Sequence, residues 1–331
     1  MLTQIKSVRR TLGVAVCLLA VVTTVANADA PLRWKFKTGD SFDYVIKRGT
    51  EGKMSLMGGG DLNFKIGMTF DVNWKVQSVS DTGTGKLELT VDRIQLGMAS
   101  PLGGDLNFDS SQAGQLAGPA AVMLGPVIDG MLGQKFSLKV SPLGEVSDIQ
   151  LPEKLDEVFK KQQTSQNRGQ GFGPGGSGFS ERGLKELITR SVLPLPEAAP
   201  SKDVSWKQHF ENPIMKAGTQ MTDVTYSYAG DESADGKKLA KIAAQTELTF
   251  VPEENPMADI EITSQEGKST FYFDPAAGKM TKAEGVQTFV MEITGPREMT
   301  QDVKETWNMS LGKSPPPKPA EAKDAKAAGK Q

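Results

Sequence analysis

IGMTFDVNWKV, residues 66–76, decides the fold class of this chain. Apolar side chains alternate with small or polar ones along the whole stretch, and this period of two gives a β-strand one apolar face that a helix could not present. The turn-forming sequence DTGTG follows at residues 81–85, and Leu87, Leu89 and Val91 then alternate in the same way. Two such runs joined by a glycine-containing turn predict a β-hairpin with one buried face.

The same pattern extends in both directions from this hairpin. Further strands are predicted at residues 32–37, 41–47, 136–140, 224–228, 239–250, 286–293 and 303–311. The hairpin predicted within residues 224–250 mirrors that of residues 66–96, and the aromatic strand end LNFD at 106–109 resembles FYFD at 271–274. The sequence therefore predicts a mainly β protein of two related antiparallel halves, forming a curved sheet or half-barrel with a few short helices.

Three segments depart from the strand pattern. Short helices are predicted after Pro152 and after Ser180, where apolar residues recur at helical spacing. Residues 112–133 are rich in Ala, Gly, Leu and Met, and we expect helical segments interrupted at Pro119 and Pro126. We interpret this segment as an apolar lid or plug. The strand face of residues 68–76 is expected to be covered either by this segment or by the opposing half of the chain.

The chain divides by composition into five parts. We expect a signal peptide at residues 1–28, a β-rich half at 29–161, a Gly/Gln-rich flexible linker at 162–179, a second β-rich half at 180–311, and a disordered Lys/Ala/Pro tail at 312–331. Whether the two halves form one domain or two is left open by the sequence.

The first 28 residues have the order of a secretory signal. Three basic residues precede an apolar run from Leu12 to Val25, and Ala26-Asn27-Ala28 provides a small-residue cleavage site. The residues around Cys17 do not fit a lipoprotein signal, and Thr11-Leu12-Gly13 does not fit a twin-arginine signal. We predict export to the periplasm or beyond, a mature chain that begins at Asp29, and no transmembrane span after cleavage.

The composition excludes several classes of function. Cys17 is the only cysteine, so the mature chain would have no disulfide, thiolate metal site or cysteine nucleophile. Residues 29–311 carry a net charge of about −8, which predicts no binding to nucleic acid. The last twenty residues hold five lysines against two carboxylates, so an anionic envelope component is a candidate partner for the tail.

No catalytic, cofactor or metal site is predicted from motifs. Asp81-Thr82-Gly83 matches the aspartic protease tripeptide, but the chain has no second copy, and a hairpin turn explains it. GFGPGG at residues 171–176 has glycines at dinucleotide-binding spacing but lies in the predicted linker rather than between a strand and a helix. His209 is the only histidine, which excludes a multi-histidine metal site.

Three longer stretches carry a resemblance to a family. LRWKFKTGDSFDYVI at residues 32–46, FSLKVSPLGEV at 136–146 and FYFDPAAGKM at 271–280 together resemble a family of uncharacterised exported bacterial proteins, known chiefly from planctomycetes. That resemblance implies no activity. In architecture, the expected curved sheet with an apolar internal segment is similar to the periplasmic lipoprotein-carrier half-barrels.

The leading hypothesis is an exported, non-enzymatic envelope protein that binds a lipid or another hydrophobic molecule in a β-lined cavity. The residues expected to line it are Phe70, Val72, Trp74, Met123 and Leu124. A structural or scaffolding role in the envelope is the first alternative, and a carboxylate-based hydrolase is the second.

Overall fold

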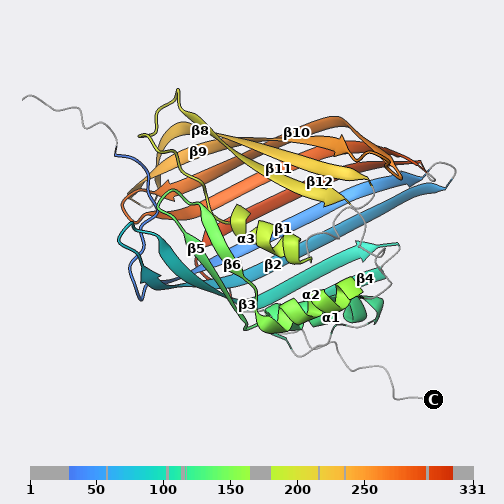
Figure 1. Cartoon of the computed structure of the whole chain (residues 1–331), viewed down its shortest axis with the longest axis horizontal. Coiled ribbons are helices and arrows are strands. Elements are labelled where there is room, and N and C mark those ends of the chain that lie inside the picture. Colours follow the sequence, from blue (N-terminus) through green and yellow to red (C-terminus); the bar gives the residue numbers. More distant parts are fainter. Residues whose placement is uncertain are drawn as a thin grey trace, which may run out of the picture.

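The computed structural model describes residues 30–56, 59–101, 104–112, 116, 118–164, 180–214, 217–234, 236–295 and 298–315. These residues form a strongly curved, open sheet of twelve antiparallel strands (Figure 1), and the prediction of a mainly β fold is confirmed. The strands are β1 (Ser41–Leu56), β2 (Gly60–Val79), β3 (Gly85–Ser100), β4 (Gly104–Asp109), β5 (Lys135–Val140), β6 (Val146–Gln150), β7 (Ser205–Ile214), β8 (Gly218–Ala234), β9 (Lys237–Pro252), β10 (Asp259–Asp274), β11 (Lys279–Thr294) and β12 (Met299–Leu311). The helices are α1 (Gly118–Met131), α2 (Glu153–Thr164) and α3 (Glu181–Arg190).

The strands of both halves of the chain belong to one sheet. Its order is β6-β5-β3-β2-β1-β12-β11-β10-β9-β8-β7, and β4 pairs with the far part of β3. The first and last strands, β1 and β12, pair side by side in the middle, where Ile46 lies opposite Met309. One hydrophobic core runs across the junction and includes side chains from both halves, such as Trp74 and Phe273.

The alternation of β2 sets the buried face, and a bulge in β3 keeps it continuous. Phe70, Val72 and Trp74 are all buried on the concave side of the sheet. Apolar residues of β3 occupy odd positions up to Val91 and even positions from Ile94 onward, which would place them on opposite faces of a regular strand. The register shifts here: Val91 pairs with Val72 and Arg93 with Asp71, which leaves Asp92 as an extra, unpaired residue. This bulge returns the apolar side chains from Ile94 onward to the concave face.

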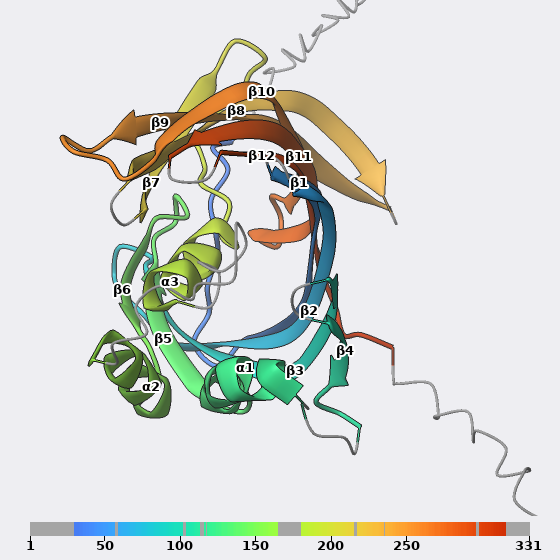
Figure 2. The ribbon, with the colours of Figure 1, turned by 90° about the vertical axis from the view of Figure 1, so that its right-hand side faces the viewer.

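Helix α3 lies on the concave side of the sheet, as Figure 2 shows. Ser180 caps it by accepting a hydrogen bond from the backbone N–H of Gly183 at 3.0 Å. Leu184 and Ile188 are buried, because they share the face of this amphipathic helix that packs on the sheet. The chain that follows is held by Trp34, whose Nε1 donates to the Leu193 carbonyl at 2.9 Å.

The strand predicted at residues 32–37 is absent. The alternation is real, since Leu32 and Trp34 are buried, but the segment does not join a ladder. The Trp34 N–H donates to the Pro142 carbonyl and the Lys35 N–H to the Gly278 carbonyl, so its backbone is paired with two separate loops. Buried alternation therefore reflects an extended segment here and not a strand.

The expected break at Pro126 is also absent, because α1 is continuous through it. Proline removes one hydrogen bond from a helix interior, but Leu124, Val127 and Ile128 are buried around it, and this packing holds the helix together. Helix α1 lies beside α2 near β3 (Figure 2).

The helices expected after Pro152 and Ser180 are confirmed as α2 and α3, and α2 continues to Thr164 inside the range predicted as linker. Residues 1–29, 165–179 and 316–331 lie outside the described residues, and with them the predicted leader, most of the linker and most of the tail.

Candidate functional site: a cavity beneath helix α3

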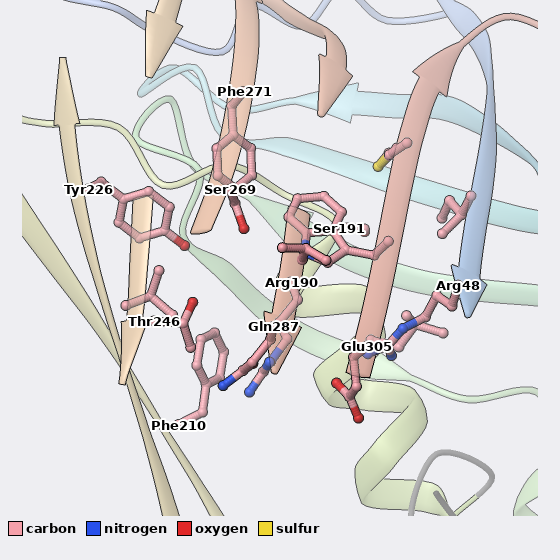
Figure 3. Close-up of a pocket in the computed structure, with 16 residues that line it drawn as sticks. Arg48, Arg190, Ser191, Phe210, Tyr226, Thr246, Ser269, Phe271, Gln287 and Glu305 are labelled. Atoms are coloured by element: carbon pink, nitrogen blue, oxygen red, sulfur yellow. The ribbon is translucent and has the colours of Figure 1, made fainter. Parts of the chain in front are cut away.

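A cavity of about 90 Å³ lies between α3 and the concave face of the sheet (Figure 3). Its walls come from the second half of the sheet together with β1 and the end of α3. The residues that line it are Ile46, Arg48, Leu187, Arg190, Ser191, Phe210, Val224, Tyr226, Thr246, Ser269, Phe271, Val286, Gln287, Glu305, Trp307 and Met309. Aromatic and aliphatic side chains thus share this space with two guanidinium groups, one carboxylate and several hydroxyl groups.

Arg190 enters the cavity from the last turn of α3. Its Nη2 forms an ion pair with Oε1 of Glu186 at 2.6 Å, one helical turn earlier. Its guanidinium carbon lies 4.4 Å from the centre of the Phe210 ring, a cation–π contact with β7. The Nε atom is buried and has no hydrogen-bond partner among the described residues. Burial lowers the pKa of Arg190, because removal from water disfavours the charged form.

Polar residues of β11, β12 and β1 face the same space. The buried Nε2 of Gln287 also has no hydrogen-bond partner among the described residues. Arg48 and Glu305 stand on neighbouring strands near Arg190, and each has an electrostatic effect on its guanidinium. Within the described part of the chain, neither of them has an oppositely charged group within 4.0 Å.

A row of aromatic rings runs beside the cavity, and Tyr226, Phe271 and Trp307 of this row line it. Tyr226 stacks on Trp206 with 5.7 Å between ring centres, and it lies at the same distance from Phe271. Phe271 in turn lies 5.4 Å from Trp307. The Tyr226 hydroxyl donates to Oε1 of Gln208 at 3.1 Å, and burial raises its pKa above the ordinary value. This row offers a rigid, largely apolar surface.

A second chamber of about 50 Å³ lies further along the concave face. Ile46, Leu187 and Ser191 line both chambers, so the two are neighbours under the same helix. The remaining residues of the second chamber are almost entirely apolar: Phe70, Val72, Trp74, Leu89, Val91, Met131, Phe136, Leu184 and Ile188. The buried Nε1 atom of Trp74 belongs to this group and has no hydrogen-bond partner among the residues that the structure describes.

Of the five residues expected to line a ligand cavity, three line the second chamber and two lie on α1. Phe70, Val72 and Trp74 line the second chamber. Leu124 is buried in the core on α1 but does not line either chamber. Met123 lies on α1, and its side chain is outside the described residues. Contact of any of them with a ligand stays a prediction.

The remaining sequence motifs are located on a turn, on an exposed strand face and outside the described residues. Asp81-Thr82-Gly83 forms the turn between β2 and β3, with Gly83 at a φ of 82°. His209 is 45% exposed on β7, and its Nδ1 lies 2.8 Å from Oδ1 of Asp223. The glycine motif at 171–176 lies outside the described residues. In the described ranges, no three His, Cys, Asp or Glu side chains are placed to hold a metal ion. Of the helices that the structure describes, none is long and apolar enough to cross a membrane.

The polar residues of the first chamber were missed by sequence reasoning. Arg190 follows the rule that basic residues favour the last turn of a helix, so it gave no sign of a second role. One sequence signal was available: a polar residue interrupts the apolar face of each strand. Gln287 shares a face of β11 with the apolar Phe289, and Glu305 shares a face of β12 with the apolar Val303.

Comparisons with known proteins give fold likenesses of low similarity. Lipovitellin, in a structure concerned with lipid–protein interactions, is 10% identical with a TM-score of 0.43, and the match covers 86% of this chain and 27% of the lipovitellin chain. A candidate lipoprotein from Parabacteroides distasonis is 10% identical with a TM-score of 0.25, over 86% of this chain and 100% of the other. An outer membrane channel from Pseudomonas putida is 8% identical with a TM-score of 0.23, over 87% of this chain and 98% of the other.

A search of curated proteins gives no match. One family model matches residues 82–295, which is more than half of the chain and extends from the turn before β3 to the end of β11. Because the match covers this much of its length, the chain belongs to the family of unknown function DUF6263.

Proposed function

We propose that this protein binds a hydrophobic or amphipathic molecule, such as a fatty acid, between the concave face of its sheet and helix α3. The observation that carries the proposal is the pair of adjoining chambers under α3, whose walls are mainly apolar and aromatic. Ligand sites of proteins are typically concave and apolar with a few polar groups, and the two chambers have this composition.

The two chambers are too small for such a ligand unless helix α3 moves. Volumes of about 90 and 50 Å³ hold several water molecules but not a whole acyl chain. Helix α3 is a short element whose inward face rests on the sheet through Leu184, Leu187 and Ile188. A shift of α3 away from the sheet would join the two chambers into one trough, so binding requires movement of this helix.

Dodecanoate and dodecanol are suitable probes, with binding measured by isothermal titration calorimetry. Thr246 lines the first chamber, and Thr249 lies on the same strand with its side chain exposed on the opposite face. Thr246→Phe should fill the chamber and weaken binding about tenfold, equal to ~1.4 kcal/mol. Thr249→Phe is the matched control and should leave binding unchanged.

The scaffold alternative makes the opposite prediction. A sheet whose core is simply filled would bind neither probe, and protein purified from its host would carry no small molecule in native mass spectrometry. That pair of results would reject the binding proposal. Equal loss of affinity in both phenylalanine variants would show that the chamber under α3 is not the binding site.

We also propose that the protein is an exported bacterial envelope protein whose mature chain begins at Asp29, because its first 28 residues have the order of a signal peptide. Intact-mass measurement of the protein from the envelope fraction should give the mass of residues 29–331. An uncleaved or lipid-modified amino terminus would contradict this proposal.

A further inference from the structure

We infer that the molecule bound under α3 carries an anionic head group, a carboxylate or a phosphate, which Arg190 and Arg48 hold in the first chamber. This inference rests on the proposed binding function and adds the chemistry of the ligand. It follows from three features of the chamber: donors without acceptors, an excess of positive charge, and the position of the polar groups relative to the apolar chamber.

The first feature is a pair of buried donors without acceptors. The Nε atom of Arg190 and the Nε2 atom of Gln287 are both buried, and neither has a hydrogen-bond partner among the described residues. Both residues line the first chamber, and Figure 3 labels both of them. Buried polar groups are rarely left unpaired in folded proteins, and a ligand that supplies acceptor atoms would satisfy both donors.

The second feature is the charge of the lining. Two arginines and one glutamate face the first chamber, so the lining is net positive. Arg190 is partly neutralised by its ion pair with Glu186, but within the described residues Arg48 has no carboxylate within 4.0 Å. Guanidinium groups bind carboxylates and phosphates through paired hydrogen bonds, which favours an anion over a neutral head group.

The third feature is the position of these groups along the trough. Arg190 is the last residue of α3, Ser191 follows it, and Leu187 lies one turn earlier. Ser191 and Leu187 line both chambers, whereas Arg190 and Gln287 line only the first among the described cavities. A head group at Arg190 would thus direct its hydrocarbon chain past Leu187 towards the apolar chamber that contains Trp74.

The test compares dodecanoate, dodecyl phosphate and dodecanol, which share one chain and differ in the head group. Wild-type protein should bind at least one of the two anions about tenfold more tightly than dodecanol. Arg190→Gln should remove most of this preference and leave the affinity for dodecanol unchanged. Arg182→Gln is the matched control, because Arg182 stands on the same helix but is exposed and donates to the backbone of Glu211 in β7.

A second pair of variants keeps the test valid if Arg190→Gln unfolds the protein. Arg48→Gln should weaken the binding of the anions, and Glu305→Gln should strengthen it, because removal of the one carboxylate in the lining lowers the repulsion of an anion. The two changes affect neighbouring strands and alter charge in opposite directions, so a general loss of folding cannot produce both results.

The outcomes separate this inference from the proposed function. Tighter binding of either anion, lost in Arg190→Gln or Arg48→Gln, supports the inference, and the better anion identifies the head group. Equal binding of all three probes, unchanged in the arginine variants, would overturn it while leaving the binding function intact. Failure of every probe to bind would reject the binding function itself.

Discussion

Asp109→Asn tests a nearly buried ion pair at the far edge of the sheet. The Asp109 carboxylate on β4 accepts from Nε of Arg93 at 2.9 Å and from Nη2 at 2.5 Å, so the contact is bidentate. It also accepts from Nε2 of Gln95 and from the backbone and hydroxyl of Ser111. The two charged side chains are only 11% and 13% exposed. These contacts lower the pKa of Asp109, with the Arg93 hydrogen bond as the largest cause.

The expected cost follows from the loss of one partner of a buried pair. Breaking such a pair destabilises a protein by ~3–5 kcal/mol, because the remaining charge is left buried without compensation. The slight exposure of both groups places the change near the lower end. At ~2 °C for each kcal/mol in a chain of this size, Asp109→Asn should lower the melting temperature by about 6 °C.

The control is an ion pair with a similar N–O distance whose two side chains are exposed to solvent. Lys139 Nζ lies 2.7 Å from Oδ2 of Asp148, but these side chains are 50% and 60% exposed, so Asp148→Asn should cost less than ~1 kcal/mol. Replacing Arg93 and Asp109 together by leucines should cost less than Asp109→Asn alone, because no buried charge is left unpaired. The reasoning fails if Asp148→Asn is as damaging as Asp109→Asn, or if the double variant is the least stable.

The pH dependence has a definite sign. A carboxylate whose pKa is lowered in the folded state contributes stability that is fully present above the ordinary Asp pKa of about 3.9 and is lost as the pH falls through its folded value. The difference in melting temperature between wild type and Asp109→Asn should therefore be constant from neutral pH down to about pH 5 and shrink below pH 4. Calorimetric scans over this range measure it.

Three further changes test separate parts of the fold. Tyr44→Phe removes a buried hydrogen bond of 2.7 Å to the Met280 carbonyl and should cost ~1–3 kcal/mol in urea denaturation. Gly144→Ala should cost more than ~1 kcal/mol in the same assay, because a Cβ at this φ of 80° would lie 2.2 Å from a backbone carbonyl oxygen. NMR titration of His209 should give a pKa above the ordinary value of about 6.5, owing to its hydrogen bond with Asp223, and Asp223→Asn should lower it. The stability from this pair should be present below about pH 6.5 and lost as the pH rises through the folded pKa.

The fold class could be predicted because one face of most strands is buried. Residues 66–76 show this directly, since every second side chain from Phe70 onward lies in the core. The first part of β10 could not be found in the same way. Residues 259–266 lie beyond the main core and are half-buried or exposed, and they are held in the sheet by backbone pairing with β11. Their apolar alternation is limited to Ile260 and Ile262, which is too short to predict a strand.

The candidate site could be predicted only on its apolar side. Phe70, Val72 and Trp74 were identified as cavity-lining because their alternation marks a buried face, and they line the second chamber. The polar side depends on register. Arg48 lies opposite Trp307 across β1 and β12, a pairing between the two ends of the chain that no local pattern indicates. The sequence offers two covers for this strand face, residues 112–133 and the opposing half of the chain. Both contribute, because Met131 of α1 lines the second chamber together with Leu184, Leu187 and Ile188 of α3.

The central position of the β1–β12 ladder bears on how the chain folds. Leu56 pairs with Met299 and Tyr44 with Leu311, so most of the sequence separates the residues that pair in this ladder. Hairpins such as β2–β3 and β8–β9 need only nearby residues and can form early, but the ladder that joins them must wait for the last strand. During folding, two separate half-sheets with unpaired edges would exist until β12 is added, and the protein is most exposed to aggregation in this interval.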